Sequence, residues 1–199
     1  MEQNFIKAVE NRRSVYGLGG KTSVPDEELL DLIRRAVKAS PTAFNSQGGR
    51  VAVLLGSQHE KLWDQTLGIL RGLVPAGGFA KTEQKIRSFR AGHGTVLFFE
   101  DQGVVRGLQK NFPLYRDNFP VWSLQSSGML QVVVWTALEE AGLGASLQHY
   151  NPLIDEKVRE NWKTPQDWKL LAQMPFGSVT EKPGEKEFLP VEERLKVFR

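Results

Sequence analysis

The stretch Ser40-Pro41-Thr42-Ala43-Phe44-Asn45-Ser46-Gln47-Gly48-Gly49 lies between a helical pattern and an apolar run. Pro41 disfavours a helical conformation for Ser40, so the preceding helix is expected to end there. The loop that follows is rich in hydroxyl, amide and glycine groups that have no strand ladder to join. Such a loop either hydrogen-bonds to itself as a turn or presents those groups to a polar, planar ligand. The local chemistry favours the turn and leaves the ligand alternative open.

The segments on either side of this loop predict a helix and a strand. Leu29, Ile33 and Val37 recur at helical spacing after start signals in 23–26. The run Arg50–Leu55 is apolar and β-branched, which predicts a central strand covered on both faces.

The rest of the chain alternates between the same two patterns. Helices are predicted over 3–13, 58–73, 81–90, 123–141 and 151–162, and strands over 95–99, 145–150 and 168–176. The segment 17–20 is expected to be a flexible connection, 74–78 a helix break, and 177–199 a charged tail. About four strands with covering helices predict an α+β or α/β sandwich. With no convincing linker, residues 1–199 are expected to form a single domain.

Composition narrows the classes of protein that the chain can be. Its 199 residues are 40% hydrophobic and 25% charged, as in ordinary soluble domains. The absence of cysteine excludes disulfides, thiol nucleophiles and thiolate metal sites. The net charge of +3 is scattered, which argues against a nucleic-acid partner and suits anionic small molecules. No apolar run has the length of a signal peptide or membrane span, so a cytoplasmic location without a membrane partner is expected.

Few side chains are candidates for catalysis. The histidines His59, His93 and His149 lie far apart in sequence, and no metal-ligand spacing, phosphate-binding loop or nucleophile motif is present. We therefore expect no metal site. The shortage of catalytic groups beside several polar loops indicates chemistry supplied by a bound cofactor.

Two further segments have both a structural and a functional interpretation. Arg12 and Arg13 could offset the dipole of a helix end, or could clamp a phosphate together with Ser14. The aromatic run Phe112–Trp122, with two Phe-Pro pairs, suits either core packing or the wall of a pocket or subunit contact. The local sequence favours the dipole interpretation for the arginines and does not choose between the alternatives for the aromatic run.

The motifs taken together resemble one family. The segments Arg12-Arg13-Ser14-x-Tyr16, Pro41–Gln47, the paired Phe-Pro run and Gly142–Asn151 occur in the order typical of FMN-dependent nitroreductases. The chain is most similar to the compact branch that includes the fungal fatty-acid-repression-mutant type and its bacterial relatives. This resemblance implies a three-layer α+β sandwich, with a central, mostly antiparallel sheet flanked by helices. It also implies an intertwined homodimer with two FMN sites at the interface.

The resemblance also implies roles for particular residues. Arg12, Arg13 and Ser14 would face the FMN phosphate, ribityl chain and pyrimidine edge, and the 41–47 loop would approach the flavin, in part from the other subunit. A backbone N–H beside Gln148 and His149 would point towards flavin N5. The implied cofactor-binding set is Arg12, Arg13, Ser14, Tyr16, Pro41, Thr42, Ala43, Asn45, Gln47, Gln148, His149 and Lys186. The acceptor pocket is expected to be lined by Phe44, Phe112, Tyr115, Phe119 and Trp122.

Two positions depart from the family pattern. Phe188 stands about where many relatives carry a second basic residue after Lys186, and Arg194 is the nearest substitute. Tyr16 stands where longer members often have a basic residue. Phosphate binding is therefore expected to depend mainly on Arg12 and Arg13.

The implied activity is NAD(P)H-dependent reduction of nitroaromatics, quinones or similar small acceptors, by ping-pong hydride transfer through flavin N5. No side chain is expected to act as acid or base. Two alternatives remain: an FMN-binding regulatory or stress-response protein with little turnover, and a structural dimer that binds no flavin.

Overall fold

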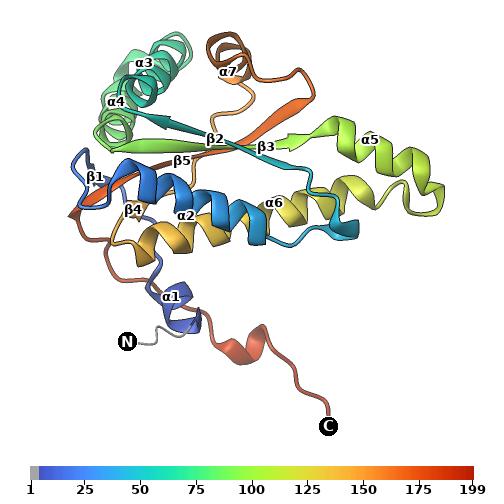
Figure 1. The fold of residues 1–199 in the computed structure, drawn as a ribbon. Coiled ribbons are helices and arrows are strands. Elements are labelled where there is room, and N and C mark those ends of the chain that lie inside the picture. The colour runs from blue at the N-terminus through green and yellow to red at the C-terminus, as the bar shows by residue number, and fades with distance from the viewer. Residues whose placement is uncertain (1–4) are drawn as a thin grey trace.

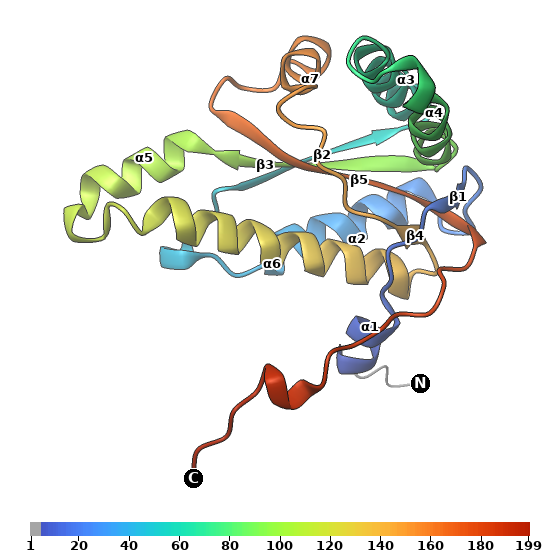
Figure 2. The ribbon, with the colours of Figure 1, turned by 180° about the vertical axis from the view of Figure 1, so that it is seen from behind.

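A computed structural model describes residues 5–199 and shows a sheet between two layers of helices (Figure 1). Helices α2 and α6 cover one face of the sheet, and α3, α4 and α7 cover the other. Seen from behind, helix α1 and the C-terminal segment extend away from the layer of α2 and α6 (Figure 2). The three-layer α+β sandwich that the resemblance implied is therefore confirmed.

The described residues form seven α-helices and five strands. The helices are α1 Phe5–Asn11, α2 Asp26–Ala39, α3 Ser57–Arg71, α4 Ala76–Arg90, α5 Gln102–Asn111, α6 Phe119–Glu140 and α7 Asp155–Trp162. The strands are β1 Gly17–Gly19, β2 Gly49–Leu55, β3 Gly94–Asp101, β4 Gly144–Ala145 and β5 Trp168–Glu181. Short 3₁₀ turns occupy Ala43–Asn45, Pro113–Tyr115 and Val191–Glu193.

The sheet has the order β1-β5-β3-β2, with β4 also paired to β5. Every pairing of these strands is antiparallel. Strand β2 pairs only with β3 among the described strands, so the prediction that Arg50–Leu55 is central is wrong. The run is apolar because both faces of the strand are buried: Val51 and Val53 pack on one core cluster and Ala52 packs on the other. A strand can be buried on both faces and still lie at the edge of the sheet, with a neighbouring strand on one side only.

Strand β3 shows why the core has two halves. Val96 and Phe98 face α2 and α6, whereas Leu97 and Phe99 face the opposite layer, and all four are buried. Alternate side chains of a strand point to opposite faces, so a strand with helices on both sides is apolar throughout.

The predicted flexible connection at 17–20 is wrong, because Gly17–Gly19 pairs with β5 as strand β1. A Cβ atom at Gly17 would lie 2.5 Å from Glu181 Cβ, and one at Gly19 would lie 2.6 Å from Ser178 Oγ. The glycines therefore permit the close approach of two backbones. In the sequence, a glycine-rich stretch with this role looks the same as a flexible linker.

Other boundaries also differ from the predictions. The 145–150 strand is shorter than predicted: β4 ends at Ala145 and is followed by an isolated bridge at Gln148. Helix α4 already begins at Ala76, inside the predicted break, and the first two residues of the 3–13 helix lie outside the described residues. The predicted charged tail begins too early, since β5 continues to Glu181.

Helix α5 was not predicted, although its start carries a recognisable signal. Asp101 caps it by accepting from the backbone N–H groups of Gly103 and Val104 at 2.9 and 3.3 Å. Over residues 5–199, none of the helices combines the length and the apolar character needed to cross a bilayer.

Candidate functional site

The 40–49 loop folds as a tight turn between α2 and β2. The Asn45 N–H donates to the Thr42 carbonyl at 3.0 Å, and the Gln47 N–H donates to Thr42 Oγ1 at 3.0 Å. The Ala43 N–H donates to Ser126 Oγ on α6 at 3.3 Å, which ties the loop to that helix. The turn alternative therefore describes the backbone of this loop.

The loop also holds an unusual backbone conformation. Phe44, Asn45 and Gln47 have φ values of 56°, 48° and 49°, and Lys163 is the one other non-glycine residue with positive φ in the described chain. This left-handed region is uncommon for non-glycine residues and an outlier for a bulky side chain such as Phe44. Strain of this kind costs about 1–3 kcal/mol per residue and clusters at functional sites.

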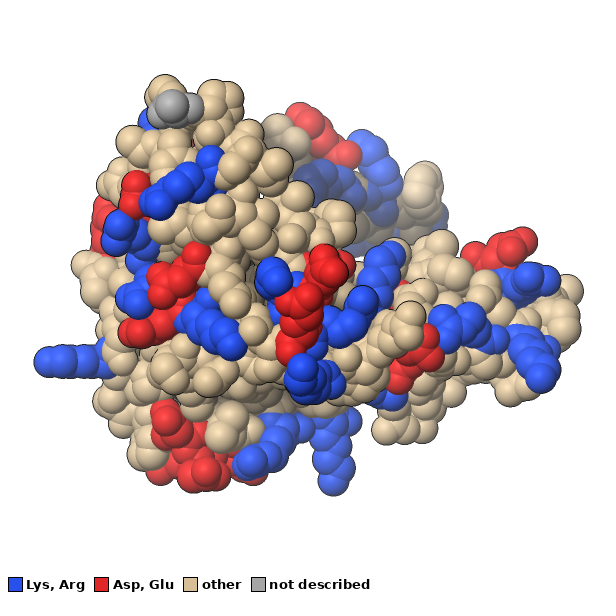
Figure 3. Space-filling view, turned by 90° about the horizontal axis from the view of Figure 1, so that it is seen from above, with Lys and Arg blue, Asp and Glu red and all other residues tan. Residues whose placement is uncertain are grey.

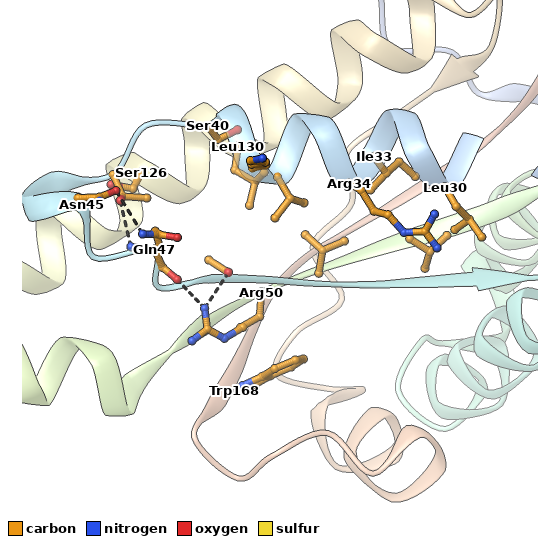
Figure 4. Close-up of a pocket in the computed structure, with 16 residues that line it drawn as sticks. Leu30, Ile33, Arg34, Ser40, Asn45, Gln47, Arg50, Ser126, Leu130 and Trp168 are labelled. Atoms are coloured by element: carbon orange, nitrogen blue, oxygen red, sulfur yellow. Dashed lines mark hydrogen bonds between the residues drawn. The ribbon is translucent and has the colours of Figure 1, made fainter. Parts of the chain in front are cut away.

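A groove of about 920 Å³ opens beside the loop, between α2, β2 and α6 (Figure 4). Asn45, Gln47 and Ser126 lie together at one end of it, and Trp168 lies across β2 from Leu130. The Arg50 guanidinium donates to the Gln47 carbonyl at 2.5 Å and pairs with Asp101 at 2.9 Å. Side chains of Thr42, Asn45 and Gln47 therefore line an open cavity although the loop backbone is paired internally.

Of the groove residues, sequence reasoning assigned only Thr42, Asn45 and Gln47 to a site, and it missed Arg50, Ser126 and Trp168 among others. Arg50 directly follows the loop in the sequence, and this position could have indicated that it belongs to the same site. Ser126 lies within an apolar helix and Trp168 begins a distant strand, so no sequence signal connected these two to the loop.

The five residues expected to line an acceptor pocket form a single aromatic cluster. The Phe44 ring lies 5.1 to 6.0 Å from four others, namely those of Phe112, Tyr115, Phe119 and Trp122. Phe119 is buried, whereas Phe44, Phe112 and Tyr115 are more than 40% exposed. Within this chain the rings fill the space between one another, and none of them lines the groove.

A second group of predicted residues meets at the opposite end of α6. Arg12, Arg13, Lys186 and Phe188 line a hollow of about 610 Å³ between α1 and the C-terminal segment. The Arg13 guanidinium donates to the Gly184 carbonyl at 2.7 Å, which fixes the segment beside the helix. The Arg12 guanidinium lies 4.3 Å above the Trp135 ring of α6. The fold thus assembles three cations from both ends of the sequence.

The last turns of α6 beside this hollow contain buried polar atoms without partners in the described part of the chain. They are Trp135 Nε1, Thr136 Oγ1 and Glu139 Oε2. Burial, together with the neighbouring Glu140 carboxylate, raises the pKa of Glu139, and the Arg12 charge opposes this rise. Buried polar groups normally have hydrogen-bond partners, so these three atoms, which are closed to solvent, are exceptions in this part of the fold.

Ser14, Gln148 and His149 lie along the edge of the sheet near β4. Ser14 forms a parallel bridge with Ala145, and the Val15 N–H donates to the Ala145 carbonyl at 2.9 Å. Gln148 is buried, with Nε2 donating to Ser146 Oγ at 3.1 Å, whereas His149 is exposed. The Gln148 side chain is therefore occupied inside the protein, and this edge offers a ligand its backbone groups and His149.

Tyr16 lies apart from these residues, against helix α4. Its ring is 6.0 Å from Phe89, and Lys85 Nζ is 5.8 Å from the ring centre. The two arginines of α4 are paired, Arg87 with Glu83 at 2.6 Å and Arg90 with Asp64 at 2.7 Å. The face above α3, α4 and α7 accordingly carries interspersed charges of both signs (Figure 3). The charged side chains of 81–90 therefore lie on the solvated side of α4, whereas Ile86 and Phe89 are buried.

The predicted cofactor residues thus form two groups within one chain. Arg12 contacts α6 at Trp135 and the 41–47 loop contacts it at Ser126, which are about 14 Å apart at the usual helical rise. In the described residues no hydrogen bond, ion pair or ring contact joins the two groups. Residues 5–199 also contain no group of three His, Asp or Glu side chains arranged to hold a metal ion.

The antiparallel sheet between two helix layers, with polar groups gathered at a sheet edge and at a strained loop, is an α+β sandwich of the kind that the resemblance to nitroreductases implied. A family model described as the nitroreductase family matches residues 9–178, so the chain belongs to that family. The family identifies it as an oxidoreductase of the class that acts on nitro compounds.

Three relatives show how close this likeness is. The structure of the nitroreductase CinD from Lactococcus lactis in complex with chloramphenicol is 49% identical, with a TM-score of 0.90 over 98% of this chain and 100% of that one. CinD has also been solved in complex with 4-nitrophenol. In Saccharomyces cerevisiae, the nitroreductase FRM2 is 35% identical over 94% of this chain and 93% of its own length. The putative nitroreductase HBN1 of the same yeast is also 35% identical, over 93% of each chain.

Proposed function

We propose that the chain is an FMN-dependent NAD(P)H oxidoreductase that reduces small nitroaromatic, quinone or similar acceptors. The whole chain, residues 1–199, would act as one FMN-binding domain in a cytoplasmic homodimer. The observation that carries the proposal is the meeting of Arg12, Arg13 and Lys186 around one hollow, beside a sheet edge with free backbone donors. This donor set suits a ligand with an anionic phosphate at one end and a planar polar ring at the other.

The residues present fit FMN in chemical type. Guanidinium groups bind phosphate oxygens through a bidentate fork, and the two arginines and Lys186 supply the charge. The N–H groups of Leu147 and His149 have no hydrogen-bond partner in the described part of the chain, so they are available to a ring. When bound, the flavin would supply the hydride chemistry at N5, which the protein's own side chains lack.

The protein's part in such a reaction is binding, orientation and electrostatics. Cations at the phosphate would anchor the cofactor, and donors at the ring would stabilise negative charge that develops there. The aromatic cluster and the 41–47 loop would exclude water from the acceptor side. That CinD binds chloramphenicol and 4-nitrophenol supports nitroaromatics as one acceptor class for this chain.

A second copy of the chain is part of the proposal, because the two groups of predicted residues lie at different ends of α6. The exposed face of that helix is apolar at Val121, Leu124, Met129 and Val132. These positions follow helical spacing and form one stripe. Packing two such stripes together would bury them and would bring the loop of one copy to the basic hollow of the other.

The proposal is tested on the purified protein reconstituted with FMN. The expected result is stoichiometric FMN binding, bleaching of the flavin absorbance by NADH or NADPH without oxygen, and recovery on adding 4-nitrophenol. FMN binding without bleaching would favour the regulatory or stress-response alternative. Failure to bind FMN at all would exclude both of these functions.

The dimer is tested by placing charge on the α6 stripe. Leu124→Glu with Val132→Glu should convert the dimer to a monomer, because burying two unpaired carboxylates costs several kcal/mol. Sedimentation velocity measures the mass, and FMN retention should fall with it. Leu73→Glu, at an apolar position that is 59% exposed outside the stripe, is the matched control and should leave both unchanged. A dimeric double variant would rule out this interface.

A further inference from the structure

We propose that Gln173, in the middle of β5, is a positioning residue that holds the 146–151 segment so that the His149 N–H faces the flavin site. This inference rests on the proposed function. It concerns a side chain that is completely buried and lies outside every predicted set of site residues.

The backbone of the segment alternates in direction. The N–H groups of Ser146 and Gln148 donate inward to β5, to the carbonyls of Pro175 at 3.3 Å and Gln173 at 2.7 Å. The Tyr150 N–H also points inward, to Gln173 Oε1 at 2.7 Å. Peptide groups of an extended segment alternate between its two edges, so the N–H groups of Leu147 and His149 point outward.

Gln173 holds both neighbours of His149. Its backbone exchanges two hydrogen bonds with Gln148, at 2.7 and 2.9 Å, on one side of the histidine. Its side chain accepts from the Tyr150 N–H on the other side, and Nε2 donates to Asn151 Oδ1 at 3.3 Å. Gln173 therefore fixes the chain on both sides of His149. The His149 N–H itself has no hydrogen-bond partner in the described part of the chain.

The composition of the layer makes this residue unusual. Gln173 pairs across the sheet with Leu97, which belongs to the buried apolar cluster with Phe99 and Leu170. An apolar residue would fill this place without the cost of burying an amide. A buried amide whose oxygen and nitrogen are both hydrogen-bonded rigidifies its surroundings, and here it fixes the orientation of an outward donor.

The consequence for the proposed cofactor concerns the charge of its ring. A fixed N–H donor stabilises negative charge more than it stabilises a neutral ring, because hydrogen bonds to charged acceptors are stronger. Gln173 should therefore affect the affinity for reduced FMN more than the affinity for oxidised FMN.

The experiment compares Gln173→Met, which removes both side-chain bonds at nearly constant length, with wild type. We expect the ratio of reduced-FMN to oxidised-FMN affinity to fall about tenfold. In the apoprotein, amide exchange at Tyr150 should accelerate at least about tenfold, since its bond is lost. An unchanged affinity ratio would overturn the proposal even if the variant were less stable.

Three further variants separate positioning from simple destabilisation. Gln173→Asn keeps the amide but shortens its reach, so the ratio of reduced-FMN to oxidised-FMN affinity should fall as in Gln173→Met. This variant replaces Gln173→Met in the experiment if the Met variant does not fold. Gln173→Glu keeps an acceptor for Tyr150 and should restore the wild-type exchange rate there. Gln65→Leu removes another amide contact, from Asn161 at 2.6 Å, and should leave the affinity ratio unchanged.

The two readouts also distinguish this inference from the proposed function. If wild type binds no FMN, the proposed function fails, while the Tyr150 exchange rate still reports whether Gln173 holds the segment. If wild type binds FMN and Gln173→Asn keeps the wild-type affinity ratio, only the positioning role is refuted.

Discussion

Replacing both Arg12 and Arg13 with alanine should weaken FMN binding by at least about a hundredfold, since charge-assisted hydrogen bonds contribute about 1.5–3 kcal/mol each. The two side chains line one hollow with Lys186, and Arg13 also fixes the C-terminal segment through Gly184 at 2.7 Å. The free energy of unfolding of the apoprotein should change by only about 1 kcal/mol, because one cation–π contact and one exposed hydrogen bond are lost. Fluorescence titration with FMN measures the affinity, and urea unfolding measures the stability.

The control for this double variant is Arg106→Ala. Arg106 pairs with Asp167 at 2.7 Å on an exposed surface outside the predicted FMN groups, so its removal should affect neither quantity appreciably. Equal FMN affinity in wild type and the double variant would refute the phosphate assignment and would leave the dipole interpretation of the arginines.

Acidification should destabilise the fold through His59. Burial is the main cause that lowers the pKa of His59 from 6.5 to about 4, opposed by the hydrogen bond to Arg90. The unfolded chain therefore binds a proton at pH values where the folded chain does not, so stability is complete above pH 6.5 and falls as the pH drops towards 4. The loss for this one group is about 3 kcal/mol.

The contacts of His59 explain why it remains neutral. Its Nε2 lies 3.1 Å from the Arg90 carbonyl, which can only accept, so Nε2 carries the proton. Nδ1 is then free to accept from Thr95 Oγ1 at 2.8 Å, and Thr95 itself accepts from Trp63 Nε1 at 2.9 Å. A second proton on the ring would oppose the Thr95 hydrogen bond inside the core.

The measurement is urea unfolding of wild type and His59→Gln between pH 7.5 and 4, followed by tryptophan fluorescence. The loss of stability between pH 7.5 and 4 should be smaller in His59→Gln than in wild type, because glutamine does not titrate. Thr66→Val, a buried threonine on the same helix, should change stability by a similar amount at every pH. Parallel pH profiles for wild type and His59→Gln would exclude this source of acid sensitivity.

Much of the fold could be predicted from local patterns. The amphipathic spacing of Leu29, Ile33 and Ala36 predicted α2, and the unbroken apolar run at Val96–Phe99 predicted β3. Both patterns report which faces of an element are covered, and this information is local. The strand order is not local, which is why β2 was predicted as central and β1 was missed.

The candidate site shows the same division. The residue types and their order were sufficient to indicate the family and to name Arg12, Arg13, Lys186 and the 41–47 loop. Only the tertiary structure showed that these cations share one hollow, that the loop lies about 14 Å away along α6, and that the aromatic side chains fill one another's space. Proximity depends on long-range packing, which single-residue preferences do not encode.

The chemistry of the 40–49 loop was therefore determined by its sequence, which placed hydroxyl and amide groups after a helix-ending proline. Its conformation was decided by tertiary contacts. The ring of Phe44 packs against Phe112 and Phe119, and the Ala43 N–H is held by Ser126, a residue more than 80 positions away. These distant contacts offset the strain of the left-handed conformation at Phe44, Asn45 and Gln47, which is least favourable for the bulky Phe44.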